Sequence, residues 1–190
     1  TKKDKSNVVE TIAGICAVWS LAGLSKEGES GSIVAKPHCC QILSIFVLLG
    51  LQDASEMSSD GHLIQVKTGQ GKSVLLGVLA TLLAVMGYDV DCVCYSEYLS
   101  SRDKESFAAV FDAFNVTDSV KYGTFNGLAE ASINAKGDVR QLTNDVLLKN
   151  GEASDLPEPA ERQKKILLID EVCSHSPDCH FLHSSVLRLR

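Results

Sequence analysis

The feature that most constrains the fold of this chain is a glycine loop between an expected strand and an expected helix. The strand covers residues 62–66, the helix covers residues 73–86, and the loop is Thr68-Gly69-Gln70-Gly71-Lys72-Ser73. Glycines let successive backbone N–H groups turn towards an anion, and a helix N-terminus adds positive potential. The segment therefore predicts a phosphate-binding loop.

Each residue of the loop has an expected role if the ligand is ATP with Mg²⁺. Lys72 can reach the β- and γ-phosphates, and the hydroxyl of Ser73 can ligate Mg²⁺. The residues that supply backbone around the phosphates are Thr68, Gly69, Gln70 and Gly71. Val66 stands where the general pattern has glycine, which favours the shorter loop of helicase-like and translocase-like motors. The alternative is an ordinary glycine turn.

Two acidic residues after a later apolar strand can complete such a site. Asp170 and Glu171 follow the strand expected at residues 165–169, and Asp170 lies 98 residues after Lys72. The end of a buried strand can hold Asp170 near magnesium, while Glu171 can orient or deprotonate the attacking water. The alternative is a solvated acidic strand end.

Strands and helices alternate through most of the chain. Strands are expected at residues 62–66, 90–95, 120–124 and 165–169, and helices at 73–86, 101–114 and in two stretches within 126–149. This alternation predicts an α/β fold, a P-loop (RecA-like) doubly wound parallel sheet flanked by helices. An N-terminal helix at residues 8–24 is expected to be a separate packing element. A buried helix is expected to begin at Pro37 and to end near Gly50.

Charge and cysteine content narrow the class of protein. The net charge of −6 argues against a nucleic-acid partner, because acidic surfaces repel phosphate backbones. The seven cysteines are an odd number and lie mostly in apolar segments, which indicates reduced thiols; Cys92 and Cys94 are expected to pack in the core. Every apolar stretch is shorter than the roughly 20 residues of a membrane span. We therefore expect a cytoplasmic protein with at most peripheral membrane contact. Thr1 as the first residue suggests a piece of a longer chain or a processed chain.

Three further segments carry a family resemblance. They are Tyr98-Leu99 with Arg102-Asp103, then Tyr122-Gly123-Thr124-Phe125-Asn126, and Asp170-Glu171-Val172. In order and spacing they resemble SecA, the family of ATPases that drive preproteins through the Sec channel. The matching family motifs are Asp-Tyr-Leu with Arg-Asp, which generic helicases lack, Tyr-Gly-Thr-Asn-Asn, and Asp-Glu-Val-Asp. The resemblance covers roughly residues 37–172.

The resemblance implies roles for individual residues. It gives Lys72 and Glu171 catalytic roles and assigns Mg²⁺ to Ser73 and Asp170. Gln41 matches the family's adenine-recognising glutamine, with a solvent-facing glutamine as the alternative. Arg102 matches the motif arginine, which implies a place near the nucleotide or an inter-domain cleft. A surface arginine that caps a helix is the alternative.

The resemblance also implies partners. These are a polypeptide substrate and a second nucleotide-binding domain, outside this chain, whose arginine stabilises charge on the transferred phosphate. We therefore expect the isolated chain to bind ATP–Mg²⁺ weakly and to turn it over little. Two other functions fit the motifs less well. One is a superfamily-two nucleic-acid helicase domain, and the other is a non-catalytic, nucleotide-dependent interaction module.

The chain departs from the family pattern in two places. Cys173 stands where the family has aspartate, and residues 174–190 do not resemble the family's continuation. An apparent insertion lies around residues 53–60. The cysteines and histidines of the tail lack a recognised zinc spacing, so a solvated or disordered tail is expected. The expected organisation is an N-terminal helix and linker at 1–36, a SecA-like ATP-binding domain at 37–172 and a divergent tail at 173–190.

Overall fold

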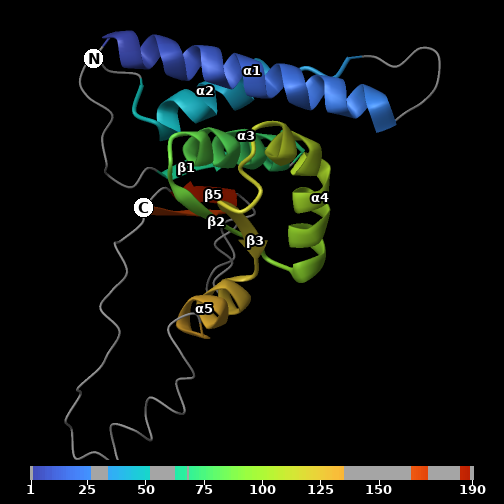
Figure 1. Cartoon of the computed structure of the whole chain (residues 1–190), viewed down its shortest axis with the longest axis vertical. Helices are drawn as coiled ribbons and strands as arrows, with labels where there is room; N and C mark the ends of the chain where they lie inside the picture. The colour runs from blue at the N-terminus through green and yellow to red at the C-terminus, as the bar shows by residue number, and fades with distance from the viewer. Residues whose placement is uncertain are drawn as a thin grey trace, which may run out of the picture.

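The computed structural model describes residues 2–26, 34–51, 63–67, 69–134, 164–170 and 185–188. In chain order the elements are α1 (Lys2–Lys26), α2 (Cys39–Leu48), β1 (Leu63–Val66), α3 (Lys72–Val85), β2 (Asp89–Val93), α4 (Glu97–Ala113), β3 (Val120–Gly123), α5 (Phe125–Asn134), β4 (Lys165–Ile169) and β5 (Ser185–Arg188). The arrangement is a mixed α/β fold with helices flanking a sheet (Figure 1).

A parallel sheet of β3, β2 and β4, in that order, lies at the centre of this fold. Val93 of β2 pairs with Gly123 of β3 and Ile169 of β4, so all three strands end at one edge. The predicted alternation of parallel strands and helices is therefore confirmed for this part of the chain. The sheet brings residues that follow β2 and β4, far apart in sequence, to the same edge.

The strand before the glycine loop pairs differently from the prediction. Instead of joining the parallel sheet, β1 pairs antiparallel with β5, with Ile64 opposite Leu187. The expectation of a tail without structure is thus wrong for residues 185–188. This segment has apolar, β-compatible residues at its centre and supplies hydrogen-bond partners to the β1 backbone. Parallel pairing is therefore confirmed for β3, β2 and β4, and the predicted doubly wound arrangement stays a prediction.

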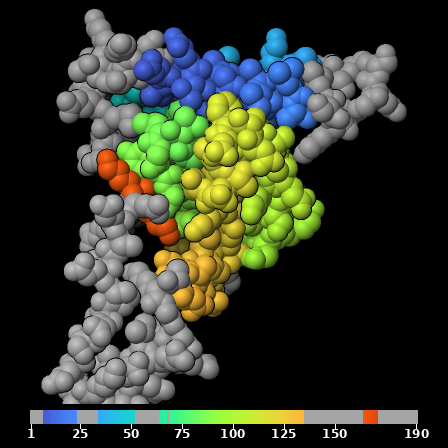
Figure 2. All heavy atoms as spheres, in the orientation of Figure 1, coloured from blue at the N-terminus to red at the C-terminus, as the bar shows by residue number. Residues whose placement is uncertain are grey.

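Helix α3 lies between the sheet on one side and helices α1 and α2, which both pack against it, on the other (Figure 1). Its ten residues from Leu75 to Ala84 are all buried, as expected for a helix that is apolar on every side. Helix α1 packs against α3 and α4 and buries Ile12 and Ile15. The prediction that the first helix is a separate packing element is therefore wrong. Figure 2 shows α1 and α5 at opposite ends of the described part.

Both ends of α3 depend on glycine in a left-handed conformation. Gly71 precedes the helix with φ +69°, and Gly87 follows it with φ +88°. The N–H of Gly87 donates to the Ala84 carbonyl (2.9 Å), and that of Tyr88 donates to the Leu83 carbonyl (3.1 Å). This pattern is a Schellman motif, which confirms the predicted end of the helix.

Helix α4 begins four residues earlier than predicted. The hydroxyl of Ser96 accepts a hydrogen bond from the backbone N–H of Leu99 (3.3 Å), which caps the new start. The extra turn carries the exposed residue Tyr98 and the buried residue Ser100. None of the described helices has the length and apolarity that crossing a membrane requires.

Candidate phosphate-binding site

The glycine loop has the backbone geometry that the sequence predicted. Gly69 and Gly71 have φ values of +81° and +69°, which a residue with a Cβ atom adopts only at a cost. Lys72 and Ser73 are the first two residues of α3, where a helix has N–H groups without intrahelical partners. Thr68 lies outside the described residues, so its predicted role stays a prediction.

Gln41 supports the loop from the side of α2. Its amide nitrogen donates to the carbonyl oxygens of Gln70 (3.0 Å) and Gly71 (2.9 Å), and its amide oxygen accepts from the His38 N–H (2.7 Å). The residue is only 4% exposed, so the alternative of a solvent-facing glutamine is wrong. Both hydrogens of the Gln41 amide group therefore form hydrogen bonds to the loop. The predicted adenine contact stays a prediction, since it requires at least one of these bonds to rearrange.

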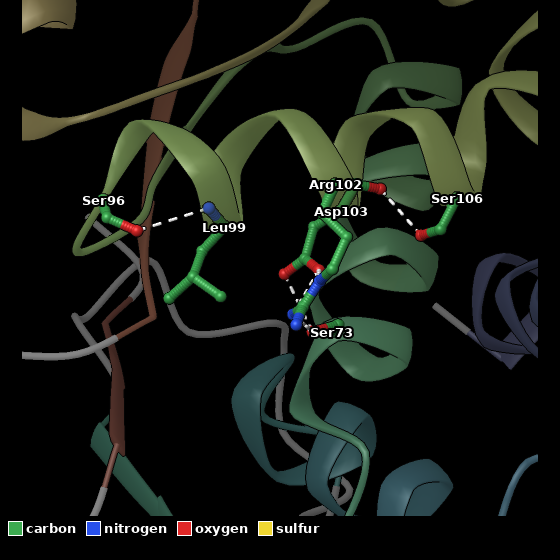
Figure 3. Close-up of polar contacts among 6 residues, drawn as sticks. All are labelled: Ser73, Ser96, Leu99, Arg102, Asp103 and Ser106. Atoms are coloured by element: carbon green, nitrogen blue, oxygen red, sulfur yellow. Dashed lines mark hydrogen bonds and ion pairs between the residues drawn. The ribbon is translucent and has the colours of Figure 1, made fainter.

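Ser73 is held by two adjacent residues of α4 (Figure 3). Its hydroxyl donates to Oδ2 of Asp103 (2.8 Å), and a guanidinium nitrogen of Arg102 lies 3.4 Å from the same hydroxyl oxygen. Arg102 also makes two hydrogen bonds to Oδ1 of Asp103, at 2.9 and 2.7 Å. The hydrogen bond and the charge of Asp103 raise the pKa of Arg102. The structure thus places Arg102 beside Ser73, and its predicted place near the nucleotide stays a prediction.

Asp103 is the residue at this site to which the sequence assigned no role, although it is part of the Arg102-Asp103 motif. Its carboxylate is 3% exposed, although carboxylates are seldom buried without a partner. The buried residues of α4 are Ser100, Asp103, Phe107, Val110 and Phe111. Asp103 therefore lies on the apolar face of an amphipathic helix, at helical spacing. A charged residue at such a position was the available signal.

Asp170 reaches the same place from the end of β4. Its N–H donates to the Val93 carbonyl (2.9 Å), which fixes it beside the end of β2. A carboxylate oxygen of Asp170, one of Asp103 and the thiol of Cys94 all lie within 4.8 Å of one another. The structure therefore brings Ser73 and Asp170 to a common site, with Asp103 between them. Glu171 lies outside the described residues, and its catalytic role stays a prediction.

The donor set at this site suits magnesium. The Ser73 hydroxyl and the Asp170 carboxylate offer oxygen, which Mg²⁺ prefers as a ligand. Because Ser73 donates its hydrogen to Asp103 and accepts a hydrogen bond of 3.4 Å from Arg102, its hydroxyl oxygen keeps one lone pair for a cation. The residues present therefore fit the ion that the sequence predicted.

The chain has a parallel sheet with flanking helices, a glycine loop at a helix start and an aspartate after a neighbouring strand. This combination is typical of the class of nucleotide-binding α/β domains. The chain belongs to the SecA DEAD-like domain family, whose model matches residues 11–174. This match begins within α1, upstream of the 37–172 range in which motifs were recognised, and it agrees with the packing of α1 into the core.

The relatives described next are far longer than this chain. The chain is 28% identical over 155 residues to the protein translocase subunit SecA of Borrelia garinii subsp. bavariensis, covering 80% of this chain and 16% of that protein. It is 26% identical over 153 residues to SecA of Olisthodiscus luteus, covering 78% of this chain and 16% of that protein. The chain thus spans about a sixth of these relatives. No solved structure matches the chain significantly.

Proposed function

We propose that this chain is the ATP-binding first motor domain of a SecA-like ATPase that couples ATP hydrolysis to the movement or remodelling of a polypeptide. The observation that carries the proposal is the placement of Ser73. It sits in the first turn of α3, two residues after the left-handed Gly71, and its hydroxyl is held by Asp103 next to Asp170. A triphosphate with its metal needs such a pairing of a helix N-terminus and carboxylates.

In the proposed complex the residues of the chain bind and orient the nucleotide. Backbone N–H groups at the start of α3 and the Lys72 ammonium bind phosphate oxygens. Ser73 and Asp170 hold Mg²⁺, which neutralises charge on the phosphates. Gln41 keeps the loop carbonyls of Gln70 and Gly71 turned towards α2. Glu171 takes the role of the base that activates water.

Asp103 and Arg102 have a positioning role in this proposal. Asp103 fixes the rotamer of Ser73, so that its oxygen stays available to the metal. Arg102 has a side chain that is 53% exposed and can exchange its bonds to Asp103 for bonds to a phosphate. The pair therefore links the nucleotide site to the surface of α4.

ATP binding by the chain tests the proposal. We expect weak binding that needs Mg²⁺, measured by isothermal titration calorimetry. Ser73→Ala and Lys72→Ala should each weaken the affinity by about tenfold or more, which corresponds to roughly 1.4 kcal/mol. Ser106→Ala is the matched control, because the Ser106 hydroxyl donates only to the backbone carbonyl of Asp103 on α4 (2.8 Å). Equal affinities in all four proteins would contradict the proposal.

The coupling to a polypeptide is tested in the complete protein. We propose a cytoplasmic motor that contacts a membrane only at its periphery, with a second nucleotide-binding domain completing the ATP site. Its ATPase rate should rise when an unfolded polypeptide is added. Stimulation by RNA or DNA alone would favour a helicase instead. The isolated chain should hydrolyse ATP slowly, and fast turnover by it would show that no second domain is required.

A further inference from the structure

A mixed cluster of a thiol and two carboxylates lies beside the glycine loop. Cys94 follows β2, Asp170 follows β4, and Asp103 reaches them from α4. One ligand atom from each lies within 4.8 Å of the other two. The parallel pairing of Val93 with Ile169 places Cys94 and Asp170 at the same sheet edge, so the backbone of two strands fixes the cluster.

The cluster is enclosed but borders solvent. Cys94 and Asp103 are 2% and 3% exposed, whereas Asp170 is half-buried and the Arg102 side chain beside it is largely exposed. Burying carboxylates together with a thiol is costly unless cations or hydrogen-bond donors compensate them. Arg102 and Ser73 compensate Asp103. A small cation could enter from the side of Asp170.

A second polar group points to a ligand in the same place. The hydroxyl of Tyr122 is buried, and its polar contact among the described residues is with the thiol of Cys92, which is a weak hydrogen-bond partner. Buried hydroxyls normally have a strong partner, and water bound to an ion in the cluster would provide one.

We propose that Cys94, Asp103 and Asp170 form a site for a thiophilic divalent cation of the Zn²⁺ class that binds in the absence of nucleotide. Mg²⁺ prefers oxygen ligands, whereas a thiolate with two carboxylates suits Zn²⁺ or Cd²⁺. Tetrahedral binding places ligand atoms roughly 3.5 Å apart, so the side chains close inward by about 1 Å. Binding converts the Cys94 thiol to a thiolate and releases one proton to solvent.

The site shares Asp170 with the proposed Mg²⁺ position. A bound Zn²⁺ would therefore occupy the carboxylate that the nucleotide's metal needs, and the two should compete. This consequence rests on the proposed function. The binding of Zn²⁺ itself does not, because it requires only the three side chains.

The experiment uses Cd²⁺ as a spectroscopic substitute for Zn²⁺, because a thiolate bound to Cd²⁺ absorbs in the ultraviolet by charge transfer. The chain first receives serine at Cys39, Cys40, Cys173 and Cys179, which removes exposed and C-terminal thiols. We expect one equivalent of Cd²⁺ to produce the band without nucleotide, and Zn²⁺, but not excess Mg²⁺, to abolish it. In this background Cys94→Ser should remove the band.

Cys92→Ser is the matched control, since Cys92 lies two residues earlier, within β2, and is equally buried but outside the cluster. It should keep the band. Asp170→Asn retains the thiol and should weaken Cd²⁺ binding at least tenfold, which keeps the test decisive if Cys94→Ser fails to fold. No band in the parent, a band that persists in Cys94→Ser, or unchanged affinity in Asp170→Asn would overturn the proposal. A Cd²⁺ band without ATP–Mg²⁺ binding would refute only the proposed function.

Discussion

The contact between Gln41 and Gly71 allows the most detailed prediction about stability. A Cβ atom on Gly71 would overlap the amide nitrogen of Gln41. Gly71→Ala therefore has two costs. The left-handed φ of +69° costs an alanine about 1–2 kcal/mol. Displacing Gln41 removes its two hydrogen bonds to the loop, each with a net contribution of about 0.5–1.5 kcal/mol.

The sum is a loss of about 2–5 kcal/mol in the free energy of unfolding, and Tm falls by roughly 2–4 °C for each kcal/mol. A double-mutant cycle with Gln41→Ala separates the two costs. Because Gln41→Ala already removes the overlapping side chain, Gly71→Ala in that background should cost only the backbone term, about 1–2 kcal/mol.

Urea unfolding followed by circular dichroism measures the cycle. Gly87→Ala is the matched control, since Gly87 has φ +88° but open space where the Cβ atom would lie. Its cost should be about 1–2 kcal/mol and additive with Gln41→Ala. If Gly71→Ala and Gln41→Ala add to within about 0.5 kcal/mol, the inferred contact between loop and α2 is absent.

Substitutions at four further positions test the packing and the pH dependence of stability. Gly77→Ala should destabilise the chain by about 1–3 kcal/mol, because the new Cβ atom would lie 2.6 Å from the Phe107 ring. Gly14→Ala on α1 meets open space and should stabilise the chain by roughly 0.5–1 kcal/mol. The midpoints of urea unfolding measure both changes. Asn115→Ala should lose about 1 kcal/mol, since Asn115 ends α4 at φ +54°, while Asn115→Gly should melt no lower than the parent. Burial raises the pKa of the Cys16 thiol above its ordinary value of 9.0. The contribution of this thiol to stability is therefore full below pH 9.0 and is lost as the pH rises towards the raised pKa. Cys16→Ala should make the fall in stability at alkaline pH less steep, and an unchanged slope would contradict this.

The elements that sequence predicted best are those with strong local signals. The strand at residues 165–169 matches β4 residue for residue, and Gly87 ends α3 as expected. The long apolar run of α3 and the glycines on either side of it are local signals that together determine where this helix forms. The start of α4 was missed, because a serine N-cap competes with other polar residues in the same stretch, and Ser96 was not distinguished from them.

The long-range features could not be read from periodicity. The pairing of β1 with β5 joins segments more than a hundred residues apart, and nothing local in either strand specifies its partner. At the site, the loop and its serine were predictable, since glycine and hydroxyl spacing is a local signal. The burial of Asp103 and its bond to Ser73 required the packing of α4 against α3. Cys94 was expected only to pack in the core, and it does so while also bordering the carboxylates.

The most direct test of the central claim is to observe which backbone amides respond to ATP–Mg²⁺. In ¹H–¹⁵N correlation spectra of the chain, we expect the largest shifts to fall on Gly69, Gly71, Lys72 and Ser73, and these shifts should vanish when Mg²⁺ is chelated. Shifts that concentrate elsewhere, for example on α5, with the loop amides unmoved, would contradict the assignment of the glycine loop as the phosphate-binding site.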